Sequence, residues 1–173
     1  MRIGIDISQT AYEKTGTAAY LLSLTEALLR IDKKNEYVLF FSSLRGKMPY
    51  IKINDKTVIK KFRFPPTLLS LVWNKWHILP IERLIGDVDV FLTSDWTEPP
   101  TKKAKKASII YDLIVYRFPK ETHKKIISTQ RKKLRWLKKE ESVVFCISQS
   151  TKNDVSEILG IPRDKLKVVY PGI

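Results

Sequence analysis

A single carboxylate interrupts an apolar segment near the middle of the chain, where residues 108–121 read SIIYDLIVYRFPKE. Inside a packed sheet an unpaired carboxylate is strongly destabilising, so Asp112 must either be paired or lie at the solvent-exposed end of a strand. The second placement is typical of active sites. Asp112 is therefore the first candidate for chemistry, and a helix cap or a salt bridge to a nearby Lys or Arg is the structural alternative.

Other polar residues follow predicted strands in the same way. Near the ends of three further apolar runs lie Ser8, Ser94, Asp95 and Ser148. In an open sheet of parallel strands, ligands bind beyond the carboxyl ends of the strands. We therefore expect these side chains and Asp112 to converge on one edge of a sheet.

The elements that would position them alternate along the chain. Apolar or alternating runs predict strands over residues 2–7, 36–43, 57–64, 88–94, 107–113, 142–148 and 165–170. Apolar residues at helical spacing predict helices over 18–32, from Pro119 to about Lys139, and over 151–160, where Gly160 lies just past the last turn. The basic, proline-marked segment 97–106 is predicted to be a loop. This alternation predicts an α/β fold with an open, mainly parallel, doubly wound sheet.

Composition bounds the class of protein. The 173 residues suffice for one domain, and a hydrophobic content of 43% makes disorder unlikely. A net charge of +14 favours anionic partners such as nucleic acid, acidic lipid or phosphorylated substrates, although lysine-rich surfaces also occur in thermophiles. The start MRIGIDIS lacks signal-peptide features and no 18-residue apolar segment occurs, which predicts a cytoplasmic protein, in solution or peripheral on the membrane.

Several common sites are excluded by residue type. The six glycines form neither GxGxxG nor GxxxxGK[ST], and the nucleophile motif GxSxG is missing. Two histidines and one cysteine are too few for a zinc site, so His77 is interpreted as a packed or interfacial side chain and Cys146 as a buried one. No signature of specific nucleic-acid binding occurs.

Three segments together resemble a known family: residues 4–29, the pair VDVFLTSDWTEPP and SIIYDLIVYRFPKE, and residues 144–173. They are similar to the N-terminal domain of family 4 (group 1) glycosyltransferases, which have the two-domain GT-B fold. The resemblance implies a single Rossmann-like domain over 1–173 that binds the acceptor. It further implies a separate domain for the nucleotide sugar, transfer with retention, and no metal or other cofactor. The family's donor signature, two glutamates eight positions apart, does not occur in this sequence.

The resemblance also assigns roles to residues. Thr15, Gly16 and Thr17 correspond to the glycine loop that approaches donor phosphates, with an ordinary turn as the alternative. Acceptor contacts are expected from the residues after the strands, namely Ser8, Gln9, Ser94, Asp95, Ser148 and Ser150, although Ser150 could equally cap the following helix. Tyr111 and Asp112 occupy the place of the family's His-Asp pair, so both are catalytic candidates. A tyrosine, with an unperturbed pKa of about 10, is a poor general base near neutral pH.

An aromatic and basic segment, residues 62–86, suggests contact with a membrane. Interfacial segments combine aromatic rings with cations, and the membrane-facing candidates are Arg63, Trp73, Lys75 and Trp76; a core helix packed on the sheet is the alternative. A glycan or lipid-linked acceptor at an anionic membrane surface would fit the charge. The rival function is a noncatalytic basic module that binds anionic membrane or nucleic acid.

Overall fold

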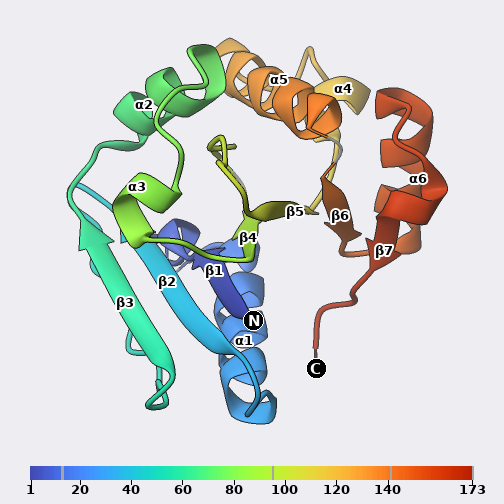
Figure 1. Ribbon diagram of the computed structural model, residues 1–173. Coiled ribbons are helices and arrows are strands. Elements are labelled where there is room, and N and C mark those ends of the chain that lie inside the picture. Colours follow the sequence, from blue (N-terminus) through green and yellow to red (C-terminus); the bar gives the residue numbers. More distant parts are fainter. Residues whose placement is uncertain (13, 95, 141, 173) are drawn as a thin grey trace.

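The computed structural model describes residues 1–12, 14–94, 96–140 and 142–172. In these ranges the chain forms one seven-stranded sheet with every pairing parallel, in the order β3-β2-β1-β4-β5-β6-β7 (Figure 1). The strands are β1 (Arg2–Asp6), β2 (Glu36–Ser42), β3 (Thr57–Phe62), β4 (Val90–Thr93), β5 (Lys105–Ile110), β6 (Val143–Cys146) and β7 (Leu166–Val168). The predicted Rossmann-like α/β fold is confirmed.

Helices cover both faces of the sheet. They are α1 (Gly16–Ile31), α2 (Pro66–Leu69), α3 (Glu82–Ile85), α4 (Ile114–Arg117), α5 (Lys124–Lys139) and α6 (Gln149–Leu159), with a 3₁₀ turn η1 (Ser8–Ala11), a π-helical turn η2 (Ser70–Lys75) and a 3₁₀ turn η3 (Arg163–Lys165). Figure 1 shows α1 on one side of the sheet and α2 and α5 on the other. Successive residues of β5 follow this division, since Ile109 packs in the cluster beneath α1 and Ile110 in the cluster beneath α5 and α6.

All three helices predicted from the sequence begin at other residues in the structure. α5 begins at Lys124 rather than at Pro119. The other two, α1 and α6, begin earlier than predicted because side chains cap them. Thr15 precedes α1, and its Oγ1 accepts a hydrogen bond from the Ala18 backbone N at 3.3 Å. Ser148 precedes α6 in the same way, with its Oγ accepting from Thr151 N at 3.0 Å. Ser150 therefore lies inside the first turn, and the alternative that it caps the helix is wrong. Gly160 ends α6 in the left-handed conformation with φ of 65°, as predicted.

The segment 66–86 buries one of its two tryptophans. Trp73 is completely buried, its ring centroid lies 5.7 Å from that of Phe40, and its Nε1 donates to the Leu79 carbonyl at 3.0 Å. The prediction that Trp73 faces a membrane is wrong, because it lies one helical turn from the buried Leu69 and points with it into the core. Trp76 is 53% exposed, and Arg63 and Lys75 are exposed as well.

No helix within the described ranges combines the length and apolar character that crossing a bilayer requires.

Candidate functional site

The predicted edge of the sheet brings most of the candidate residues together. Ser8 follows β1, Ser94 follows β4, Tyr111 and Asp112 follow β5, and Ser148 follows β6. Because the strands are parallel, these positions share the carboxyl edge of one sheet. Asp95, another candidate, lies outside the described residues.

Tyr111 joins three elements at this edge. Its side chain is largely buried, its hydroxyl lies 3.0 Å from Ser94 Oγ, and it donates to the Thr17 carbonyl at 3.4 Å. The ring meets that of Tyr20 edge-on, with 5.7 Å between centroids. The phenol thus links the ends of β4 and β5 to the first turn of α1, which fixes where its hydroxyl lies.

Asp112 is exposed at the end of β5. Its Oδ1 accepts a hydrogen bond at 3.0 Å from the backbone N of Ile114, the first residue of the short helix α4. The N-cap position of α4 is Leu113, so Asp112 lies one residue before the cap. Among the described residues it forms no ion pair with a Lys or Arg. Together with Tyr111 and Thr17 it lines a cavity of about 160 Å³, which we call the Asp112 cavity. Asp112 is therefore a strand-end carboxylate that also holds the first backbone N–H of α4.

The loop before α1 presents an open surface. Gly16 is the first residue of α1, and a Cβ atom there would meet nothing within 4 Å. Thr17 Oγ1 accepts from Gln9 Nε2 at 3.0 Å, which ties the loop after β1 to the helix. A ligand could approach the backbone at Gly16 without displacing side chains.

Gln9 and Asp6 border a second, smaller cavity of about 40 Å³. Gln9 is 7% exposed, and its Oε1 has no hydrogen-bond partner among the described residues. A cavity of this size can hold a water molecule or a ligand hydroxyl. Ser8 is less available, since its Oγ accepts from Ser42 N at 2.9 Å and so joins β1 to β2.

Asp6 is a site residue that was not predicted from the sequence, because it lies within the segment predicted as the first buried strand rather than after it. Burial raises the pKa of its carboxyl, while hydrogen bonds from Ser8, whose backbone N lies 2.9 Å from Oδ1, and the charge of Lys133 act in the opposite direction. The net result is a pKa above the usual range for aspartate.

We expect Asp6→Asn to change how stability depends on pH. A carboxyl with a raised folded-state pKa contributes stability that is fully present below its unfolded pKa, about 3.9, and is lost as pH rises through the folded pKa. The asparagine side chain of the variant would not titrate but would keep an oxygen for the Ser8 N–H. Urea unfolding of both proteins between about pH 4 and 7 should show wild type losing stability relative to the variant as pH rises. Parallel curves would contradict the raised pKa.

The loop that carries Trp96 is held by Asn74, a fully buried residue of η2. Asn74 Nδ2 donates to the Trp96 carbonyl at 2.8 Å, and its Oδ1 accepts from Glu98 N at 2.9 Å. Trp136 Nε1 donates to the Asn74 carbonyl at 2.9 Å, which adds α5 to the assembly. Nothing in the sequence pattern singles out Asn74, since its role depends on packing between distant segments.

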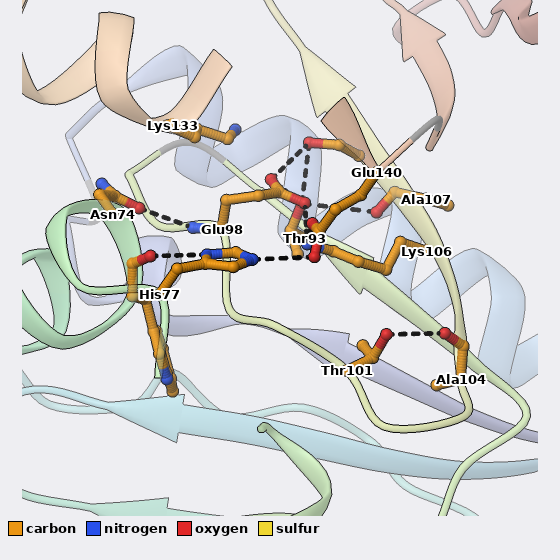
Figure 2. A network of polar contacts seen from close by, with 12 residues as sticks. Asn74, His77, Thr93, Glu98, Thr101, Ala104, Lys106, Ala107, Lys133 and Glu140 are labelled. Carbon is orange, nitrogen blue, oxygen red and sulfur yellow. Dashed lines mark hydrogen bonds and ion pairs between the residues drawn. The ribbon is translucent and has the colours of Figure 1, made fainter. Parts of the chain in front are cut away.

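A buried ionic cluster lies next to Asn74 (Figure 2). Lys106 Nζ lies 2.8 Å from Glu98 Oε1 and also contacts Glu140. Glu140 Oε1 lies 2.8 Å from His77 Nε2, and His77 Nδ1 lies 2.8 Å from the Trp73 carbonyl. Burial acts to raise the pKa of Glu140, but the hydrogen bond from His77 and the charge of Lys106 outweigh it and hold the pKa below its usual range. The cluster joins η2, β5 and the end of α5.

The sequence was also compared with known proteins. The family model for Glycosyltransferase Family 4 matches residues 14–173. A search of the curated proteins found no match.

Proposed function

The chain belongs to the family 4 glycosyltransferases, and we propose that it is the acceptor-binding domain of a retaining enzyme. The enzyme would transfer a hexose-type sugar from a nucleotide sugar to a glycan or lipid-linked acceptor. The donor would be bound by a further domain, so that this chain alone would be inactive. The reaction would need no metal and no cofactor beyond the donor, and it would take place in the cytoplasm, in solution or at the inner face of a membrane.

The observation that carries this proposal is the Asp112 cavity. It lies at the carboxyl edge of the sheet and is bordered by a fixed phenol and by an exposed carboxylate. An acceptor hydroxyl in this cavity would be within reach of Asp112, which can accept its hydrogen bond and orient it toward the donor. Tyr111, held by Ser94 and Thr17, would keep this wall of the site rigid.

The loop of Thr15, Gly16 and Thr17 supports the donor side of the proposal. It opens the sixteen-residue helix α1, whose N-terminal end carries a partial positive charge from the helix dipole. Negative charge develops on the leaving phosphate in the transition state of sugar transfer, so a positive helix end placed there lowers the barrier. The absence of a side chain at Gly16 leaves room for the donor phosphates.

A transfer assay on the native protein tests the proposal. An antibody raised against this chain would isolate the protein from its source, and the isolate would be incubated with radiolabelled nucleotide sugars and with lipid or glycan extracts. We expect transfer with at least one donor, and none by the recombinant chain alone. No transfer with any donor, together with binding of the chain to acidic vesicles, would replace the enzyme with the noncatalytic membrane-binding module.

A further inference from the structure

A groove of about 370 Å³ lies between the π-helical turn η2 and helix α5. We call it the lysine groove, because Lys75, Lys125 and Lys132 line it from these two elements. Its apolar lining includes Leu71 and Ile126. This volume lies in the range of small-molecule sites.

The charged side chains that line the lysine groove within the described part of the chain all have one sign. No acidic residue lines it among the described residues, and none of its three lysines forms an ion pair with a described residue. All three side chains are exposed, so their ammonium groups can turn toward a bound anion. Lysines that converge from two elements on an apolar surface suit a ligand with a negatively charged group and a hydrocarbon part.

The lysine groove adjoins the Asp112 cavity. Trp96 and Ile126 line both, so these two side chains form the wall that the spaces share. The backbone of Trp96 is held in position by the hydrogen bond that its carbonyl accepts from Asn74 Nδ2. A molecule whose hydroxyl lies at Asp112 could therefore extend past Trp96 and place its far end beside the lysines.

We infer that the lysine groove binds the phosphate and the adjoining hydrocarbon of a phosphate-bearing amphiphilic acceptor whose reacting hydroxyl lies in the Asp112 cavity. This inference rests on the proposed function and narrows its acceptor from any glycan or lipid-linked molecule to an anionic amphiphile. A single ligand molecule fits better than a bilayer surface, because the lysines line a concave space that adjoins the Asp112 cavity.

Binding of decyl phosphate below its critical micelle concentration tests the inference, measured by titration calorimetry with the recombinant chain. Decyl phosphate carries both the anionic phosphate and a long hydrocarbon chain. Butyl phosphate keeps the phosphate but has only a short chain, and decanol keeps the long chain but has no phosphate. We expect decyl phosphate to bind at least about tenfold more tightly than either comparison ligand, since both parts of the groove would then be used. Equal affinity for all three ligands would overturn the inference.

The double substitution Lys125→Gln with Lys132→Gln should weaken decyl phosphate binding about tenfold, by loss of two charge-assisted contacts. A matched control, Lys33→Gln with Lys34→Gln, removes the same charge from two exposed lysines in the turn before β2, at the opposite edge of the sheet. It should change the affinity less than about twofold, because exposed charges beyond one Debye length are screened. Equal losses in the two variants would show a general effect of net charge and would contradict a groove site.

A second arm separates one bound molecule from a membrane surface. Phosphatidylglycerol vesicles would be pelleted with wild type and with the Lys125/Lys132 variant. Binding to vesicles without binding to monomeric decyl phosphate would overturn the inference in favour of a surface contact. The titrations need no donor sugar, so a failed transfer assay with intact decyl phosphate binding would count against the proposed function and would leave the lysine groove as a site for an anionic amphiphile.

Discussion

Replacing Asp112 with asparagine is expected to lower the turnover of the enzyme at least about a hundredfold and to leave the domain folded. The carboxylate is exposed at the end of β5, where it can accept a hydrogen bond from an acceptor hydroxyl or assist its deprotonation. The amide of the variant would keep an oxygen for the Ile114 N–H, from which Asp112 Oδ1 now accepts at 3.0 Å, so the start of α4 should be preserved. The substitution therefore separates the chemical role of the residue from its structural one.

The assay would measure kcat and KM on the native enzyme, with thermal unfolding as the structural readout. A loss in kcat with little change in KM would show that Asp112 stabilises the transition state. A rise in KM alone would mean that Asp112 only binds the acceptor. Asp55→Asn is the matched control, because Asp55 is exposed in the turn before β3 at the opposite edge of the sheet. Unchanged turnover in Asp112→Asn would refute the catalytic assignment.

Replacing Lys106 with methionine should destabilise the domain by about 3–5 kcal/mol, the usual effect of removing one partner from a buried ion pair. Lys106 is 8% exposed and bridges Glu98, which is completely buried, and Glu140. Without the ammonium group, the Glu98 carboxylate would keep its hydrogen bond from Thr93 Oγ1 but would lose its charged partner. Urea unfolding at neutral pH would measure the loss.

Two further variants decide whether the burial of charge is the cause. Lys105→Met changes the neighbouring residue of β5, which is exposed, and should alter stability by less than about 0.5 kcal/mol. The double variant Lys106→Met with Glu98→Gln removes the unpaired charge and should recover part of the loss. No recovery would mean that packing of the lysine stem, rather than the orphaned carboxylate, explains the effect.

The order and type of most strands and helices could be predicted from the sequence, because the spacing of apolar residues indicates which side chains are buried. Every predicted strand has a counterpart in the sheet, although β5 ends at Ile110 rather than at residue 113, because Asp112 turns the chain into α4. The start of β5 was predicted as a basic loop. Lys106 is buried there beside two carboxylates that neutralise it, Glu98 from the other end of the same segment and Glu140 from the end of α5, and a local pattern does not show that pairing.

The candidate site could be predicted in its position but not in its contacts. Parallel strands place their ends at one edge, which was enough to bring Ser94, Tyr111 and Asp112 together. The roles of Asp6 and Asn74 depend on which groups face them across the fold. Trp73 is a residue that the local pattern assigned wrongly. Its basic neighbours in the sequence suggested a membrane interface, but the packing of η2 places its side chain in the core.

The strand order has a consequence for the way the chain is made. Among the described strands β1 is synthesised first, but it lies between β2 and β4, so one of its edges stays unpaired until residues 90–93 have been synthesised. During that interval β1, α1, β2 and β3 can form a partial sheet with an open, apolar edge, which is a template for association with other chains. Because every pairing is parallel, each connection spans many residues and closing the sheet is slow. Nascent chains that end between β3 and β4 should therefore be the ones that depend most on chaperones.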